Sequence, residues 1–177
     1  MDESDLDEAY AEDADAHVDE ARRLGEAVLG ATIETLEPQP AVSVPARASV
    51  REAIEAMLDR GIGAVLVLDE RGRVQGIFTE RDVMRRVALS GAALDRPVAE
   101  LMTPSPECLG LQDGVVFALN RMIVGGFRHV PIVDDADAPV AVLSLREVVA
   151  FIVSLLPARA LNLPPEPRLE ARSTDGG

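Results

Sequence analysis

The feature that most constrains the fold of this chain is an internal repeat at a spacing of 65 residues. Shifted against itself by this distance, the sequence brings like residues together without a gap, in pairs that include Val50 and Val115, Met57 and Met122, Gly61 and Gly126, Asp69 and Asp134, and Val83 and Val148. Upstream, Pro38-x-Pro40 matches Pro104-x-Pro106 at 66 residues, which places a change of one residue in a connecting loop, where such changes are tolerated. One structural unit is therefore expected to occur twice.

Each copy predicts the order helix, strand, strand, helix. In the first copy the elements are a helix from the capping box Ser49-x-x-Glu52 to Gly61, a strand over 64–68, a turn over 69–72, a strand over 74–78 and a helix from Thr79 to Ser90. The run over 64–68 is apolar throughout and rich in β-branched residues, which predicts a strand covered on both faces. In the second copy the elements are a helix over 115–124, strands over 130–133 and 140–143, and a helix from Ser144 to Leu156.

Two units with such small sheets cannot each bury both sides of a sheet. We therefore expect an α/β (α+β) fold in which two pseudo-twofold-related repeats, over 36–96 and 97–157, pack their sheets together, each with a short leading strand. Residues 21–35 contain a segment that can form a short amphipathic helix, with docking on the module or disorder as equal alternatives.

The net charge of −14 is concentrated in one tail. Residues 1–20 hold ten acidic side chains and no basic ones, which predicts a solvated, disordered segment, and the Pro-rich residues 158–177 predict an extended tail. The remaining chain is close to neutral, so composition predicts no nucleic-acid partner. The sequence contains no apolar run of about 20 residues and no basic, apolar leader, so we expect a cytoplasmic protein without a membrane partner.

Composition also argues against catalysis and against a metal centre. The chain has one cysteine, two histidines and no lysine, which excludes a disulfide within the chain, a thiolate or imidazole metal cluster and lysine-dependent chemistry. It has no Gly-x-Ser-x-Gly nucleophile elbow and no phosphate-binding Gly-x-x-x-x-Gly-Lys loop. We therefore predict that the protein is not an enzyme.

The two copies, GIGAVLVLDERGRVQGIFTERDV and GFRHVPIVDDADAPVAVLSLREV, resemble tandem CBS domains, also called a Bateman module, over roughly 36–156. The resemblance implies a non-enzymatic regulatory module that needs no cofactor. It implies that an adenine nucleotide such as AMP, ADP or ATP, the last with or without Mg²⁺, or a related adenosine compound, binds between the repeats and signals to a partner protein. It also implies a homodimer formed through the helices around Met84, Val87, Met122 and Val149.

The same resemblance assigns candidate ligand-binding residues. Asp82 would hold the ribose hydroxyls and Thr79 a phosphate, while Val42 and Ile77 would line the adenine pocket. Arg128 and His129 lie where the family often places phosphate-binding cations. The matching positions of the second copy are Val142, Ser144 and Glu147.

Physical reasoning offers two interpretations of Thr79-x-x-Asp82, and we expect both to hold: a helix cap in the free protein and a ligand contact in the bound one. The segment can cap a helix with its side chains, or it can hold a ligand at a helix N-terminus, where backbone N–H groups favour anions. A ligand-binding Asp82 should face solvent unpaired, whereas Arg81 or Arg85 would neutralise it in the alternative, a protein-interaction or dimerisation module whose clefts are filled by side chains. We otherwise expect Arg81, Arg85 and Arg86 to form a solvated helix face.

The second copy favours the cap. Ser144-x-x-Glu147 is a complete capping box, and glutamate carries its carboxylate one methylene farther from the backbone than aspartate does. We therefore expect the second site to be degenerate or to select a different ligand.

Overall fold

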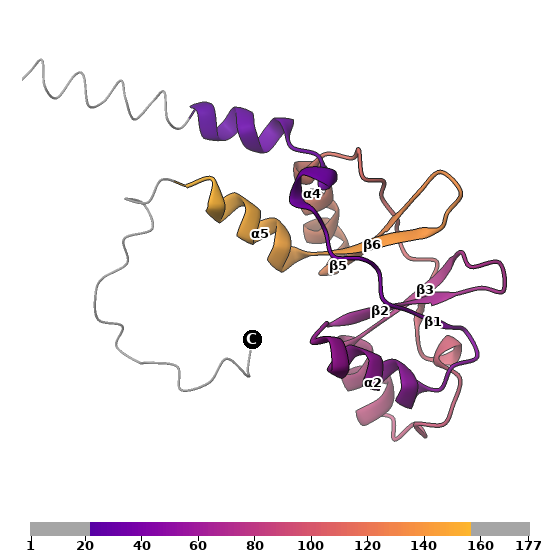
Figure 1. Cartoon of the computed structure of the whole chain (residues 1–177). Helices are drawn as coiled ribbons and strands as arrows, with labels where there is room; N and C mark the ends of the chain where they lie inside the picture. The colour runs from indigo at the N-terminus through magenta and orange to yellow at the C-terminus, as the bar shows by residue number, and fades with distance from the viewer. Residues whose placement is uncertain (1–21, 157–177) are drawn as a thin grey trace, which may run out of the picture.

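The computed structural model describes residues 22–156, so the tails predicted at 1–20 and 158–177 lie outside the described residues. Two halves of mixed helix and sheet lie one above the other in Figure 1. The first contains β1 (Ser43–Pro45), α2 (Val50–Arg60), β2 (Ala64–Leu68), β3 (Val74–Thr79), α3 (Glu80–Asp82), η2 (Val83–Ala88), η3 (Val98–Glu100) and β4 (Thr103–Pro104). The second contains η1 (Ile33–Leu36), α4 (Val115–Gly125), β5 (His129–Val133), β6 (Pro139–Ser144) and α5 (Leu145–Ser154). The predicted order of helix, strand, strand, helix is confirmed in both copies.

The two sheets share one topology. In the first, β1 runs parallel to β2, which is antiparallel to β3, and β3 pairs with β4 at the other edge. In the second, β5 and β6 are antiparallel, and single bridges from Leu109 and Pro40 take the places of the two outer strands. The ladder is irregular after Val67 in one sheet and after Ile132 in the other, which are equivalent positions at the repeat spacing.

The leading segments cross between the two halves. Ala31 and Ile33, which precede the first copy, belong to the apolar core of the second half. Val98 and Met102, at the start of the second repeat, belong to the core of the first half. The two cores therefore do not follow the boundary predicted between residues 96 and 97.

A third apolar cluster joins the two halves. It contains Ala64, Leu66 and Ile77 from the first sheet, with Val142 from β6 packed against them. The strand β2 is buried along almost its whole length, as its unbroken apolar sequence predicts. The predicted packing of one sheet on the other is thus confirmed.

The helix after Thr79 differs from the prediction. Only its first turn, α3, is α-helical, and η2 is wound as a π-helix. The N–H of Leu89 donates to Met84 O and that of Ala92 to Val87 O, both at 3.2 Å and both across five residues. Wider winding of this kind is rare and occurs frequently at functional sites.

The segment predicted at 21–35 forms a helix over 22–30 followed by η1. The helix projects from the second half and is mostly exposed, with Leu29 at 73 % of its full accessibility (Figure 1). No helix among residues 22–156 has the length and apolar character required to cross a lipid bilayer.

Candidate functional site

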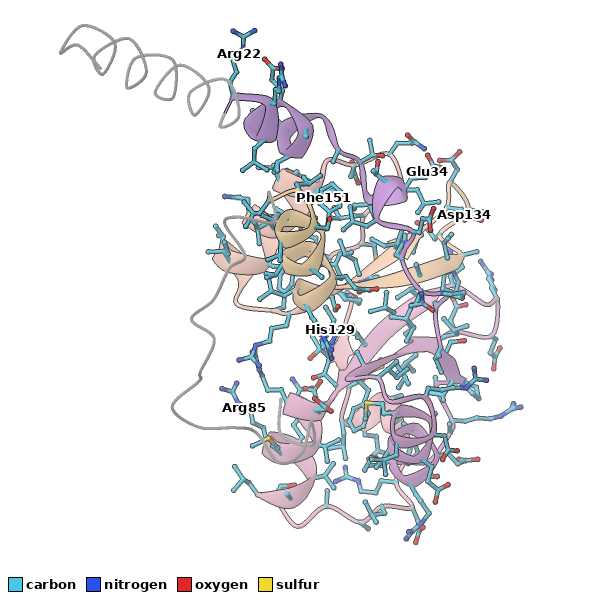
Figure 2. The ribbon with its side chains drawn as sticks, turned by 60° about the vertical axis from the view of Figure 1, so that its left-hand side comes forward. Arg22, Glu34, Arg85, His129, Asp134 and Phe151 are labelled. Carbon is cyan, nitrogen blue, oxygen red and sulfur yellow. The ribbon has the colours of Figure 1, made fainter. Side chains whose placement is uncertain are left out.

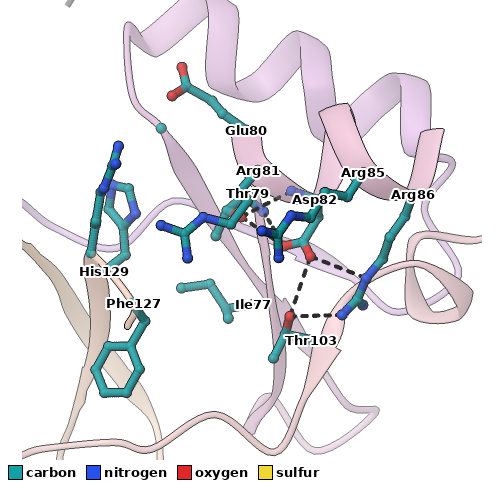
Figure 3. A pocket seen from close by; sticks show the side chains of 12 residues that line it. Ile77, Thr79, Glu80, Arg81, Asp82, Arg85, Arg86, Thr103, Phe127 and His129 are labelled. Carbon is teal, nitrogen blue, oxygen red and sulfur yellow. Dashed lines mark hydrogen bonds and ion pairs between the residues drawn. The ribbon is translucent and has the colours of Figure 1, made fainter. Parts of the chain in front are cut away.

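A cavity of about 250 Å³ lies between the two halves of the molecule (Figure 3). This volume is slightly below the range of about 300–1,000 Å³ that is usual for small-molecule sites. Its lining comes from the first half and from the segment that joins α4 to β5: Gly63, Ile77, Thr79, Glu80, Arg81, Asp82, Arg85, Arg86, Thr103, Phe127, Arg128 and His129. Four of these side chains are arginines and two are carboxylates, so the cavity favours an anion.

Five of the nine candidate residues line this cavity. They are Ile77, Thr79, Asp82, Arg128 and His129. The other four lie outside it: Val42, Val142, Ser144 and Glu147. Val42 packs against the core of the first half, and Val142 packs between the sheets. The structure therefore brings together the candidates of the first copy, except Val42, with the two cations predicted from the second copy.

Thr79 and Asp82 form the predicted cap at the start of α3. The Thr79 hydroxyl and N–H donate to Asp82 Oδ2 at 2.7 and 3.0 Å, and the Asp82 N–H donates to Thr79 Oγ1 at 3.3 Å. These reciprocal bonds form a complete capping box. One carboxylate oxygen of Asp82 is thus fully committed to the helix.

The other oxygen, Asp82 Oδ1, faces two weaker partners. Arg86 Nε lies 3.4 Å away, and the Thr103 hydroxyl donates to it at 3.4 Å. Asp82 is 7 % exposed, so the expectation of a solvent-facing, unpaired carboxylate is wrong, and its cation is Arg86 rather than Arg81 or Arg85. Both contacts are longer than the usual 2.7–3.2 Å of a good hydrogen bond. A ligand hydroxyl that binds Asp82 Oδ1 would therefore replace these two long contacts with Arg86 and Thr103 and would break no short hydrogen bond.

Arg86 is committed to the fold. Its guanidinium donates to the carbonyl oxygens of Leu101, at 3.1 Å, and of Met102. These bonds tie the segment that leads into β4 to the helix that follows Thr79. The expectation of a solvated face is therefore wrong for Arg86, and its spacing of four residues from Asp82 was the signal for this pairing.

Arg81 bridges the two halves. Its Nη1 donates to Gly126 O, in the C-cap of α4, at 2.6 Å. A cation is favoured here because the carbonyl groups at a helix C-terminus carry partial negative charge. Arg85 and Arg128 have no side-chain hydrogen bond or ion pair within residues 22–156, so their donors remain available to an anion.

His129 packs over Gly63 beside Glu80. A Cβ atom built on Gly63 would lie 3.2 Å from His129 Nε2 and 3.2 Å from Glu80 Oε2, so glycine is what leaves room for both side chains. Burial lowers the pKa of His129; Glu80 and Glu147 oppose that shift, while Arg128 and Arg81 add to it. The pKa lies below its usual 6.5, which favours a neutral imidazole at neutral pH. Figure 2 shows His129 at the junction of the two halves.

Phe127 supplies an apolar wall that sequence reasoning missed. Its ring covers Gly125 so closely that a Cβ atom there would lie 2.1 Å from Phe127 Cε1. Phe127 and Ile77 lie at the same end of the cavity, away from Arg86 (Figure 3). A large apolar residue directly after a Gly-Gly helix end was the available signal.

The second copy repeats the cap without the cations. The Ser144 hydroxyl donates to Glu147 Oε2 at 2.6 Å, and the Glu147 N–H donates to Ser144 Oγ at 3.2 Å, which confirms the predicted capping box. At the repeat spacing, the cations of the cavity correspond to uncharged residues in all but one case. The uncharged counterparts are Ala150 for Arg85, Phe151 for Arg86, Gly63 for Arg128 and Ala64 for His129. Among these side chains only Arg81 has a basic counterpart, which is Arg146.

Nothing in the described chain suggests a bound metal ion. Within residues 22–156, no three side chains of histidine, cysteine, aspartate or glutamate gather closely enough to hold one.

Comparison with known proteins identifies both copies. The family model described as CBS domain matches residues 35–89 and 98–154. The meiotically up-regulated gene 70 protein of Schizosaccharomyces pombe is 45 % identical over 103 residues, which are 58 % of this chain and 14 % of that protein. The chain therefore spans about a seventh of the length of this curated relative.

Two solved structures share the fold. The CBS-domain containing protein ATU1752 from Agrobacterium tumefaciens is 31 % identical, with a TM-score of 0.63, and the match covers 68 % of this chain and 98 % of that one. The CBS domain protein PAE2072 from Pyrobaculum aerophilum, solved in complex with AMP, is 25 % identical, with a TM-score of 0.63 and coverage of 70 % and 99 %.

Proposed function

The chain belongs to the CBS-domain family, and from this premise we propose that it is a regulatory module that binds an adenine nucleotide between its two repeats and passes occupancy to a partner protein. The observation that carries the proposal is the cavity itself, where a carboxylate oxygen with only long contacts faces arginines from both halves. The AMP complex of the Pyrobaculum protein supports the choice of ligand class.

The lining assigns a task to each part of an adenine nucleotide. Asp82 Oδ1 accepts a ribose hydroxyl in place of its two contacts at 3.4 Å. Arg85 and Arg128, one from each half, bind the phosphate, and Thr79 contributes a contact from the N-terminus of α3. Ile77 and Phe127 cover the adenine ring.

We propose a single nucleotide site per chain. The second copy retains the capping box but has glycine, alanine and phenylalanine where the first site has most of its cations. A phosphate there would meet Arg146 as its main basic partner at the equivalent positions. The predicted degeneracy of the second site follows from this loss of positive charge.

Calorimetric titration with AMP tests the proposal on the wild type and on Asp82→Asn. Asparagine keeps the size of the side chain but loses the charged acceptor, and a hydrogen bond to a charged group contributes about 1.5–3 kcal/mol. We therefore expect Asp82→Asn to weaken AMP binding by about tenfold to a hundredfold. Glu52→Gln, the same loss of charge in the capping box of α2, lies outside the cavity lining; it is the matched control and should leave the affinity unchanged.

Two results would contradict the proposal. The first is the absence of AMP, ADP or ATP binding at millimolar concentration, and the second is equal weakening by Asp82→Asn and Glu52→Gln. The absence of binding would favour the alternative, a ligand-free protein-interaction or dimerisation module. That alternative is supported by the burial of Asp82 and its pairing with Arg86, which leave the carboxylate neutralised without a ligand.

A further inference from the structure

We infer that His129 takes up a proton when a phosphate-bearing ligand enters the cavity, so that this side chain sets a preference for phosphate-bearing over uncharged ligands that grows as the pH falls. The inference rests on the proposed function, because it needs a ligand in this cavity. It adds a residue that distinguishes a nucleotide from its nucleoside.

The position of the imidazole is fixed by close packing. His129 begins β5 and pairs with Ser144 of β6, so its backbone is held by the sheet. Its ring lines the cavity and lies over Gly63, where an added Cβ atom would make a tight contact of 3.2 Å with His129 Nε2. The imidazole is therefore held at the wall of the cavity, where a ligand can contact it.

The charges around the imidazole are balanced in the free protein. Glu80 and Arg81 face it from α3, Glu147 faces it from the start of α5, and Arg128 precedes it in the chain. The two carboxylates raise the pKa of His129, and the two guanidinium groups lower it. Burial is the largest influence that remains, and it lowers the pKa of His129 and favours the neutral ring.

A phosphate would upset this balance. It adds negative charge to a cavity in which Arg81 is already committed to Gly126 and Arg86 to the main chain. Among the lining arginines, Arg85 and Arg128 keep free donors for the phosphate within residues 22–156. An opposite charge within about 4–6 Å stabilises the protonated form of a titrating group and shifts its pKa by roughly 1–3 units. The neutral imidazole can supply a further cation by binding one proton, which an uncharged nucleoside would not induce.

The sign of the effect follows from linkage. If the pKa of His129 is higher in the complex than in the free protein, the complex binds more protons between those two values, and AMP binds more tightly as the pH falls through that interval. For a shift of one unit, the affinity gains about a factor of ten. Adenosine should bind with the same affinity across the interval.

The test is an NMR titration of the histidine side chains from pH 5 to pH 8, in the free protein, with saturating AMP and with adenosine. The chain has only two histidines, so the His129→Gln variant identifies the resonance of His129. We expect the titration midpoint of His129 to rise by about one unit with AMP, the lower end of the shift that a neighbouring charge produces, and to stay in place with adenosine.

Calorimetry gives the second readout. The AMP affinity of the wild type, relative to that of His129→Gln, should increase as the pH falls from 8 to 5.5, by at most about tenfold for a one-unit shift. The phosphate group of AMP also titrates in this range, but the titration of free AMP is common to both proteins and cancels in the ratio. Gly63→Ala, which crowds the imidazole without changing a charge, should reduce the shift of the midpoint.

The outcomes separate this inference from the proposed function. If AMP binds and the midpoint of His129 stays in place or falls, the inference is overturned while the proposed function stands. If AMP binds at no pH in the range, both are overturned. The titration midpoints are measured on the wild type, and the His129→Gln variant is used only to assign the resonance.

Discussion

At the scale of single residues, the two oxygen atoms of Asp82 have different partners. Oδ2 receives both donors of Thr79 and completes the cap, whereas Oδ1 has only contacts at 3.4 Å. The choice between a helix cap and a ligand-binding group is therefore not exclusive. One carboxylate can close the first turn of α3 and still accept a hydrogen bond from a ligand.

Glu107 and Arg121 give a prediction for pH dependence. Arg121 Nη2 donates to Glu107 Oε2 at 2.7 Å, which connects the segment before the second copy to α4. The hydrogen bond from Arg121 is the main cause that lowers the pKa of Glu107 below its ordinary value of 4.5. The stabilisation is therefore present above pH 4.5 and is lost as the pH falls through the lower pKa of the folded state.

The measurement compares urea unfolding of the wild type and Glu107→Gln. We expect the wild type to be the more stable protein at pH 6, and the difference to shrink towards zero at pH 3. Glu55→Gln, a change on the exposed side of α2, serves as the control for an unpaired carboxylate. A difference that is constant over this range would show that the ion pair contributes nothing.

At the scale of elements, Gly76 shows how closely two strands approach. It lies in β3 opposite Val67 and Pro104, and a Cβ atom there would lie 2.2 Å from Met102 Sδ in the buried core of the first half. The second half has Ala141 at the equivalent position, also buried. The sheet of the second half accommodates the methyl group of Ala141, whereas the sheet of the first half has no room for a methyl group at Gly76.

We expect Gly76→Ala to lower the free energy of unfolding by about 1–3 kcal/mol, the usual cost of overpacking a core. Gly110→Ala is the matched control, because the nearest atom to its added Cβ would be Asp113 Oδ2 at 3.9 Å. Urea unfolding measures both. Equal stability of the two variants would mean that Met102 moves aside without cost.

Local sequence predicted the elements well and the packing between them poorly. The capping boxes at Ser49, Thr79 and Ser144 each involve residues three apart in the chain, so their signals are visible in the sequence. The π-winding of η2 has no such signal, since the equivalent helix of the second copy, α5, is an ordinary α-helix.

The same distinction applies to the candidate site. The family resemblance identified Ile77, Thr79, Asp82, Arg128 and His129 as site residues. It did not identify Arg81, Arg85, Arg86 or Phe127, because they line the cavity only when the two halves pack together. The helix face with Arg81, Arg85 and Arg86 would be exposed in an isolated repeat. In the pair it forms a wall of the cavity, and the sequence of one segment does not predict this.

At the scale of the whole molecule, exposed apolar helices support the predicted homodimer as a proposal. Val87 and Met122 are 7 % and 2 % exposed and belong to the cores, so they cannot form the interface. Met84 and Val149 are exposed, and so are three residues of α4: Phe117, Ile123 and Val124. Exposed apolar side chains of this kind are candidates for an interaction site.

We expect sedimentation to show a dimer at micromolar concentration, and the double change Phe117→Ser and Ile123→Ser to give a folded monomer. The loss of apolar surface removes the main driving force for association. Leu29→Ser, an equally exposed apolar position on the helix over 22–30, is the control and should leave the dimer intact. A wild-type protein that sediments as a monomer would contradict the proposal.

The crossing of the leading segments determines what happens when the chain is cut between its two repeats. A cut between residues 96 and 97 would separate Val98 and Met102 from the core that they fill, and Ile33 from its own. Neither fragment alone would contain a complete apolar core. A mixture of the two fragments would contain both cores, so we expect the fragments to associate and fold together. The segment that was duplicated is thus not the unit that folds, and the pair can be transferred between proteins only as a whole.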